Sequence, residues 1–390
     1  MAGVKERDVK VAIVAPSSVE GEMLHCVARE CGFTNALVFT DTRKALEVAK
    51  RQQFGLFISF NEFPGMTALT MMQTLRSTGN YGVEQHLFLV DPITPEVLLV
   101  LVENNITHAL TKPFSADRIA QKLTHLWHEE TNMSPFETAF REAHAAYSAG
   151  LMDMAMELAM RLLKLHGLNE KLLLLLGDAY SKTGHPTESR KFFEKAMAVN
   201  PGSAAAAHKL AHTYMLEKDF AKAADLMNEL VKLNPLNIEL LAHTGLSNFE
   251  IGNFDAAKGA MCHLQKLDSE RKDAAQVLAQ VAIKEGDYET ALAQMTGNHD
   301  KKEIIQLLNN EGIKLAQKEQ FQAAIEMYLK GLTAVTESPY VYALYYNLGL
   351  AYSRIHDNAN AAKFLRKAIE IKPDFEKATL ALSRLELKSA

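Results

Sequence analysis

The chain has 390 residues, of which 48% are hydrophobic, and its 42 Lys and Arg against 47 Asp and Glu give a formal net charge of −5. This length predicts two or three domains of ordinary globular composition, and the acidic balance argues against non-specific nucleic-acid binding. The apolar runs are too short to span a bilayer, so no membrane insertion is expected. The three cysteines, Cys26, Cys31 and Cys262, fit neither a disulfide framework nor a zinc pattern and favour a reducing cytoplasm.

Strand-like and helical patterns alternate over residues 1–128. Strands are expected at 9–14, 36–39, 54–60, 86–90 and 108–110, and helices at 20–31, 43–51, 68–77, 96–104 and 115–129. Strands and helices that alternate at this spacing predict a parallel sheet with both faces covered. Five such units fit an α/β fold of the flavodoxin-like order.

Three short motifs identify this segment further. They are Ala45-Leu46 at the second helix, Pro64-Gly65-Met66 after the third strand, and Lys112-Pro113-Phe114-Ser115 after the fifth. With this joint spacing the segment resembles a response-regulator receiver domain, the CheY-like fold. The resemblance implies a bacterial signalling setting.

The positions that carry phosphoryl chemistry in receiver domains are mostly changed. The acidic pair that holds Mg²⁺ corresponds to Ala15 and Pro16, the phospho-accepting aspartate to Phe60, and the Thr/Ser sensor to Val90; only the lysine, Lys112, is kept. Phosphoryl transfer to a carboxylate needs a nucleophilic oxygen and a cation. We therefore expect a degenerate pseudo-receiver without a metal or catalytic site.

Two residues leave an alternative open. Asp91 lies one residue past the sensor position and is a candidate for an atypical acceptor or ligand. Lys112 is expected to be solvated, because its usual anionic partner is missing, or to be a relic salt-bridge donor.

The helix expected at 96–104 is apolar on all sides. A helix of this kind needs cover on every side. Its residues Val97, Leu98, Leu101 and Val102 form a candidate dimer face. A homodimer, docking onto the rest of the chain, and cover by the domain's own core all remain open.

After a polar linker at 129–135, a pattern of 34 residues repeats. Its clearest copies begin at Leu176, Leu210 and Thr244, with small residues at Ser189, Ala223 and Ala257, and large ones four positions later. The pattern resembles the tetratricopeptide repeat (TPR), a helix–turn–helix unit that stacks into a superhelix with a concave groove. Residues 136–390 are expected to hold six to seven repeats and a C-terminal capping helix. The breaker at 296–300 predicts either a bend in the array or a local loop.

The resemblance places the groove on the first helix of each repeat. The groove positions in this chain are Asp178, His208, His212, Met215, Glu239, Leu246, Phe249, Asn309, Ile313, Tyr346 and Leu350. This mixture suits an extended or helical peptide. His208 and His212 share a helix face, but no third ligand accompanies them, so neither a metal nor another cofactor is expected.

These patterns predict a non-enzymatic bacterial signalling adaptor or scaffold. Its pseudo-receiver would dock to a signalling partner, and its TPR groove would bind a protein or peptide. The alternative is a two-component response regulator that is phosphorylated at an atypical acceptor and uses the repeats as its output domain.

Overall fold

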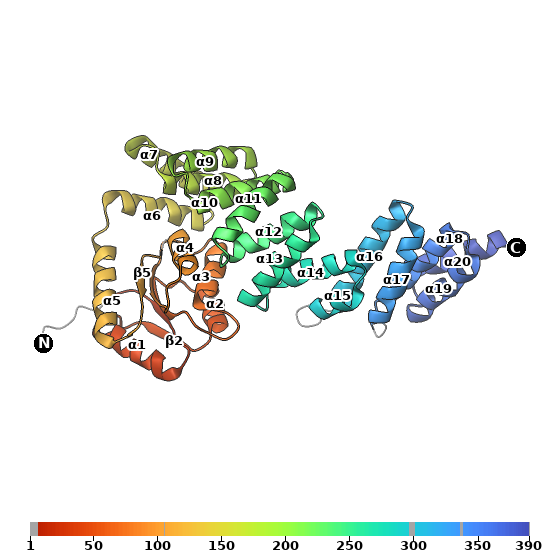
Figure 1. Cartoon of the computed structure of the whole chain (residues 1–390), viewed down its shortest axis with the longest axis horizontal. Coiled ribbons are helices and arrows are strands. Elements are labelled where there is room, and N and C mark those ends of the chain that lie inside the picture. The colour runs from red at the N-terminus through yellow and green to blue at the C-terminus, as the bar shows by residue number, and fades with distance from the viewer. Residues whose placement is uncertain (1–6, 105, 296–300, 336–337, 390) are drawn as a thin grey trace. The chain divides into compact units, whose positions relative to one another are not determined.

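The computed structural model describes residues 7–104, 106–295, 301–335 and 338–389 and divides into two compact units. The first unit comprises Met1–Ala256 and His263–Ser269, and the second comprises Ala257–Cys262 and Glu270–Ala390. Figure 1 shows the elements of both units in chain order. Among the described residues, no helix is both long and apolar enough to cross a membrane.

A five-stranded parallel sheet forms the centre of the N-terminal α/β domain. The strands are β1 (Val11–Val14), β2 (Ala36–Phe39), β3 (Leu56–Phe60), β4 (Gln85–Leu89) and β5 (His108–Leu110). Their order is β2-β1-β3-β4-β5, with Ile13 of β1 between Val38 of β2 and Ile58 of β3. The sheet confirms the predicted fold class. The first and third strands begin two residues later than expected, because Gly55 N–H donates to Lys10 O in a connection before the ladder starts.

Five helices cover the two faces of this sheet. They are α1 (Ser18–Glu30), α2 (Thr42–Arg51), α3 (Ala68–Ser77), α4 (Pro95–Glu103) and α5 (Ala116–Thr131). Apolar side chains of α1 and α5 pack on one face, and those of α2, α3 and α4 pack on the other.

Hydroxyl and carboxylate side chains begin each of these helices. The N-cap residues are Ser17, Asp41, Thr67, Thr94 and Ser115, and each accepts a hydrogen bond from the backbone N–H three residues later. Such caps satisfy a backbone donor that the first helical turn leaves free.

The remainder of the described chain is helical. Its helices are α6 (Pro135–Ser148), α7 (Met152–His166), α8 (Glu170–Lys182), α9 (Pro186–Val199), α10 (Ala204–Leu216), α11 (Phe220–Leu233), α12 (Ile238–Glu250), α13 (Phe254–Leu267), α14 (Lys272–Glu285), α15 (Tyr288–Met295), α16 (Lys301–Gln317), α17 (Phe321–Ala334), α18 (Tyr342–Arg354), α19 (Asn358–Ile371) and α20 (Glu376–Ser389). Among the described residues, α6 to α19 are as many helices as seven two-helix repeats would have, and α20 follows them. The linker is shorter than expected, since α5 continues to Thr131 and α6 begins at Pro135.

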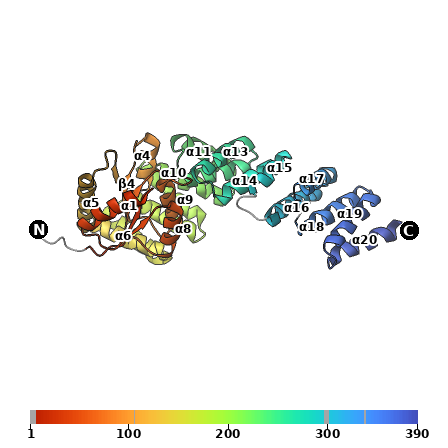
Figure 2. The same ribbon diagram turned by 90° about the horizontal axis from the view of Figure 1, so that it is seen from below.

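Small residues of the first helix meet large residues of the second helix in several repeats. A Cβ atom added at Gly177 of α8 would overlap the Phe193 ring of α9, and one at Gly312 would overlap the Tyr328 ring. At Gly349 the added atom would lie 2.8 Å from Leu365 Cγ. Figure 2 shows the helices of the second unit following one another from α16 to α20. The repeat spacing in the sequence is therefore a spacing of close helix contacts.

The turn inside each repeat uses a left-handed residue. These residues are Gly150 (φ 78°), Gly184 (79°), Lys218 (62°), Gly252 (80°), Gly286 (78°), Glu319 (61°) and His356 (63°). The first five are 34 residues apart, so backbone conformation repeats with the sequence pattern. The predicted breaker at 296–300 lies outside the described residues.

Candidate functional site

The sheet edge that the sequence resemblance predicts to correspond to a receiver phosphorylation site is apolar. Ala15, Phe60 and Val90 are all buried, whereas Pro16 is exposed. The Phe60 ring packs edge-on against Phe114, with centroids 5.4 Å apart. Among the described residues there is no group of three His, Cys, Asp or Glu side chains that could hold a metal ion. These four positions offer neither a nucleophilic oxygen nor ligands for a cation.

The Lys112 side chain is 64% exposed, and it also has an anionic neighbour that was not expected. Its Nζ lies 3.8 Å from Oδ2 of Asp91. Asp91 follows β4 and Lys112 follows β5, and the two strands are neighbours in the sheet. Parallel strands bring their carboxyl ends together, which places the two side chains side by side.

The predicted four-residue dimer face on α4 is split between two sides of the helix. Leu101 is buried and Val97 packs partly against the core. Leu98 and Val102 remain 52% and 65% exposed. Residues four apart share a helix face, so the domain's core covers one pair and leaves the other outside.

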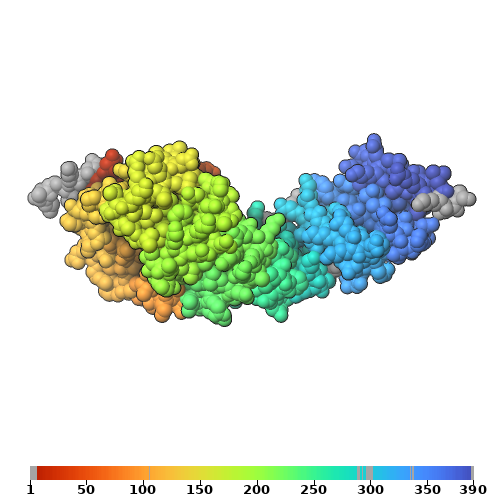
Figure 3. Space-filling model, turned by 90° about the horizontal axis from the view of Figure 1, so that it is seen from above, coloured from red at the N-terminus to blue at the C-terminus, as the bar shows by residue number. Residues whose placement is uncertain are grey.

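The α/β domain packs against the repeats of the first unit through side chains that bind backbone groups. Gln73 of α3 donates to Leu236 O and accepts from Ile238 N–H, both at 3.0 Å. Gln73 is only 5% exposed, and Leu236 packs against the domain's core. In the space-filling view, the first repeats (yellow to green) adjoin the α/β domain (orange) along the face shown (Figure 3).

Charged residues extend this contact on both sides of Gln73. Glu103, the last residue of α4, accepts hydrogen bonds from the side-chain amides of Asn234 and Asn237, the latter at 2.9 Å. Arg43 of α2 forms an ion pair with Asp268 at 2.8 Å. Burial raises the pKa of Glu103, while the two asparagine bonds act in the opposite direction. The contact between the two domains is polar and specific, because Glu103 and Arg43 each bind particular side chains at the ends of repeat helices.

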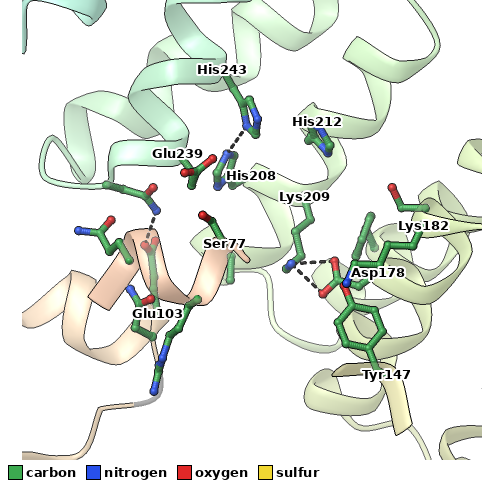
Figure 4. A pocket seen from close by; sticks show the side chains of 17 residues that line it. Ser77, Glu103, Tyr147, Asp178, Lys182, His208, Lys209, His212, Glu239 and His243 are labelled. Carbon is green, nitrogen blue, oxygen red and sulfur yellow. Dashed lines mark hydrogen bonds and ion pairs between the residues drawn. The ribbon is translucent and has the colours of Figure 1, made fainter. Parts of the chain in front are cut away.

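A pocket of about 380 Å³ lies where α3 and α4 approach the first helices of four successive repeats (Figure 4). Most repeat residues that line it come from α6, α8, α10 and α12: Tyr147, Asp178, Ser181, Lys182, Ala205, His208, Lys209, His212, Glu239 and His243. Phe193 of α9 and Asn237, the residue before α12, complete the lining from the repeats. The α/β domain contributes Gln73, Arg76, Ser77, Glu103 and Asn104. The pocket is therefore built by both domains of the first unit.

Four of the eleven predicted groove residues line this pocket: Asp178, His208, His212 and Glu239. Met215 is buried at 9% exposure, and Leu246 and Phe249 do not line the pocket. The sequence analysis missed the residues that α3 and α4 contribute. A polar residue in an amphipathic helix is normally predicted to face solvent, so these residues gave no sign of a pocket. The repeat pattern alone gives no signal for the domain that packs against it.

In the second unit the remaining predicted groove residues lie on α16 and α18. Asn347 Nδ2 donates to Asn309 Oδ1 at 2.5 Å, and the Tyr346 ring contacts Phe375 with centroids 5.1 Å apart. Ile313 is 37% exposed, and Leu350 is half-buried. Their role in binding stays a prediction.

Three histidines form a cluster in the pocket of the first unit. His208 Nε2 lies 3.0 Å from His243 Nδ1, and the His212 ring stacks on His243 with centroids 4.5 Å apart (Figure 4). Burial lowers the pKa of His208 well below its ordinary value, and positive neighbours act in the same direction. Burial also lowers the pKa of His212. Both rings are therefore neutral near pH 7 and act as hydrogen-bonding groups.

Ion pairs and an aromatic ring hold the other charged side chains of the pocket. Lys209 Nζ contacts both oxygens of Asp178 at 2.7 and 2.8 Å. Lys182 Nζ lies 4.0 Å from the centre of the Tyr147 ring. Burial raises the pKa of Tyr147, so its hydroxyl is protonated at neutral pH. The arrangement offers contacts for a bound partner but no nucleophile paired with a base.

Comparison with known proteins identifies the repeats. Models of the tetratricopeptide repeat match residues 184–243 and 342–375, and these segments are TPR repeats. The chain is 25% identical over 204 residues to a tetratricopeptide repeat protein 30 homolog of Aedes aegypti, which covers 51% of this chain and 30% of that protein. It is 29% identical over 192 residues to the BBSome complex member BBS4 homolog of Drosophila melanogaster, and this match covers 48% of this chain and 38% of that protein. The chain thus spans well under half the length of these two relatives.

The N-terminal domain has a separate similarity. The chain is 21% identical over 123 residues to chemotaxis protein CheY-3 of Vibrio cholerae, which covers 32% of this chain and 95% of that protein. Among solved structures, MamA is 20% identical with a TM-score of 0.37, covering 42% of this chain and 91% of that one. A tetratricopeptide repeat protein from Parabacteroides merdae is 17% identical with a TM-score of 0.39, and the match covers 64% of this chain and 98% of that one.

Proposed function

We propose that this chain is a non-enzymatic adaptor that binds protein partners through its TPR repeats, in which the receiver-like domain is a docking module and not a phosphorylation switch. The repeat matches support a protein-interaction scaffold as the class of function. The observation that carries the rest is the replacement of the expected acceptor by Phe60, which is buried against Phe114.

The role of the α/β domain follows from its contacts. It buries Gln73 and Glu103 against loops of the repeats, and a domain held in this way fixes the surface that a partner meets. We expect a signalling protein to bind the domain's outer side, and a protein or peptide to bind the repeats. A homodimer through Leu98 and Val102 remains a further prediction, which sedimentation equilibrium of the full chain would test.

Capture of partners from a bacterial lysate on the immobilised full chain tests this proposal. Cross-linking followed by mass spectrometry should place at least one reproducible partner on helices of the repeats. The double variant Ile313→Glu, Tyr346→Ala serves to separate binding at the second unit from binding at the first. A chain that captures no protein at either unit would contradict the adaptor function.

A second function is favoured by one contact. Asp91 has a carboxylate 3.8 Å from Lys112, the pairing that a phospho-accepting aspartate would need. Incubation with acetyl phosphate and Mg²⁺, followed by intact-mass measurement of the unchanged chain and of Asp91→Asn, distinguishes the two functions. A phosphoryl adduct that Asp91→Asn abolishes would favour the response regulator, and no adduct would favour the adaptor.

A further inference from the structure

A second pocket of about 410 Å³ adjoins the one described above, and its walls come from both domains of the first unit. The two pockets share the lining residues Glu103, Tyr147, Asp178, Ala205 and Lys209, so they adjoin each other and are treated together as one cleft. We call it the junction cleft. Apolar and charged side chains both line it, and where they lie indicates what it can bind.

In the half formed by the second pocket, apolar side chains lie beside polar ones such as Glu170, Lys171 and Asn200. Leu99 and Val102 come from α4, Phe140 from α6, and Leu174 and Leu175 from α8. Val102 is 65% exposed, although it is a large aliphatic residue. Covering apolar surface of this kind is favourable by about 25 cal/mol per Å². An apolar side chain of a partner would gain this energy here.

The other half has one permanent cation without a counter-ion. Arg76 pairs with Glu84 at 2.8 Å, and Lys209 pairs with Asp178. In the part of the chain that the structure describes, Lys182 forms no ion pair, and its ammonium rests on the Tyr147 ring. Figure 4 shows Lys182 and Tyr147 beside the paired Asp178 at the edge of the pocket. A ligand carboxylate would complete this set of charges.

The acidic groups of the cleft give a basic ligand less to bind. Both oxygens of Asp178 are occupied by Lys209, and Glu103 accepts from Asn234 and Asn237. Glu170 accepts from the side-chain amide of Asn200 at 2.8 Å, and Glu239 also has an interaction partner. His208 and His212, whose pKa values burial lowers, are neutral near pH 7 and offer ring nitrogens for hydrogen bonds. Charge complementarity therefore selects an acidic group beside an apolar one.

We infer that the junction cleft binds a short peptide segment of a partner protein in which an aliphatic or aromatic side chain lies within two residues of an aspartate or glutamate. The apolar side chain packs against Leu99, Val102 and Leu174, and the carboxylate pairs with Lys182. This inference rests on the proposed adaptor function and deepens it by naming the recognised segment. Because α4 supplies one wall, the segment is recognised only while the α/β domain is packed against the repeats.

Selection of a displayed library of random heptapeptides on the immobilised full chain tests the inference. We expect the selected peptides to carry an apolar residue within two positions of an acidic one. A synthetic copy of the most enriched peptide should lose about tenfold in affinity for Lys182→Met, the size of one charge-assisted contact. It should lose a similar factor for Val102→Glu, which places a carboxylate in the apolar half at an exposed position.

Lys195→Met is the matched control. Lys195 also lies over an aromatic ring, 5.3 Å from the centre of Phe192, but it does not line the cleft. Its substitution should leave peptide affinity unchanged. Circular dichroism of the three variants should match that of the unchanged chain, because none of the substituted side chains is in the core.

Three outcomes would overturn the inference. They are a selection that yields no binding peptide, selected peptides that are basic or lack an acidic residue, and peptides that bind Lys182→Met and Val102→Glu as tightly as the unchanged chain. In each case the adaptor function still stands if the full chain captures a partner on its repeats. Loss of that capture as well would show that the proposed function itself is wrong.

Discussion

The edge of the α/β sheet and the helix crossings of the repeats depend on their side chains to different degrees. At the sheet edge, Ala15, Phe60 and Val90 are apolar and buried, and the parallel sheet is complete. At the crossing of α8 and α9, the lack of a side chain at Gly177 is what allows Phe193 to fit. The parallel sheet is therefore complete with apolar side chains at its edge, whereas the helix crossing depends on one residue that sets the distance between two helices.

The largest effect is expected at that crossing. The substitution Gly177→Ala places a Cβ atom in the Phe193 ring, and overpacking of this kind costs about 3 kcal/mol of unfolding free energy. Gly259→Ala is the control, because nothing lies within 4 Å of the added atom. At that position the better helix propensity of alanine should raise the free energy of unfolding by up to about 1 kcal/mol. Urea denaturation measures both, and equal effects would contradict the account of the repeat spacing.

A smaller effect is expected where the two domains meet. Gln73→Ala leaves Leu236 O and Ile238 N–H without their partner, which costs about 2 kcal/mol for buried backbone groups. Hydrogen exchange at the Ile238 amide should accelerate. Gln53→Ala removes an exposed bond to Asn80 O and should leave that amide unchanged. Unchanged protection in Gln73→Ala would mean that the side chain does not hold the domain in place.

The sheet domain also contains a buried histidine that sharpens the comparison. His86 is 2% exposed and stacks on Phe57 with centroids 5.0 Å apart. Burial lowers its pKa in the folded state, although the bond to Glu84 acts in the opposite direction. The contribution of neutral His86 to the free energy of unfolding is therefore fully present above its unfolded pKa of about 6.5. It falls as the pH drops below that value, by at most about 1.4 kcal/mol per pH unit.

The variant His86→Gln keeps a donor for Glu84 but cannot be protonated. Thermal unfolding measured from pH 7.5 to 5.5 should show a weaker loss of stability for this variant than for the unchanged chain. His128→Gln, at an exposed position of α5, should behave like the unchanged chain. An identical pH dependence in all three proteins would rule out His86 as a source of acid sensitivity.

The smallest effect concerns the turns of the repeats. Lys218 adopts φ 62° at a position that is glycine in the repeats on either side, Gly184 and Gly252. A left-handed residue other than glycine costs about 1–2 kcal/mol, partly offset by the greater freedom of glycine in the unfolded chain. Lys218→Gly should therefore raise the midpoint of thermal unfolding slightly, and Gly184→Ala should lower it. A lower midpoint for Lys218→Gly would contradict a strained turn.

Most elements of this fold could be predicted from the sequence, because they follow from local patterns. The helix at Ala68–Ser77 and the strands at Ala36–Phe39 and His108–Leu110 have the expected bounds. The repeats were predictable since their packing residues recur at a fixed spacing.

The junction cleft could be predicted only in part. The repeat pattern placed Asp178, His208, His212 and Glu239 on one surface, but it gave no indication that Gln73 and Glu103 would meet loops more than 130 residues away in sequence. The Asp91–Lys112 pair was missed for a similar reason. Its two residues follow neighbouring strands, and a sequence analysis that treats each motif separately does not show that their side chains lie close together.

The central claim is that the receiver-like domain is a fixed docking module and not a phosphorylation switch. Hydrogen exchange of the full chain, measured with and without acetyl phosphate and Mg²⁺, tests it most directly. The account predicts identical protection in both states at residues 87–91 and at the Ile238 amide beside Gln73. A phosphodonor-dependent change at both places would contradict it, because the domain would then sense phosphorylation and transmit it to the repeats.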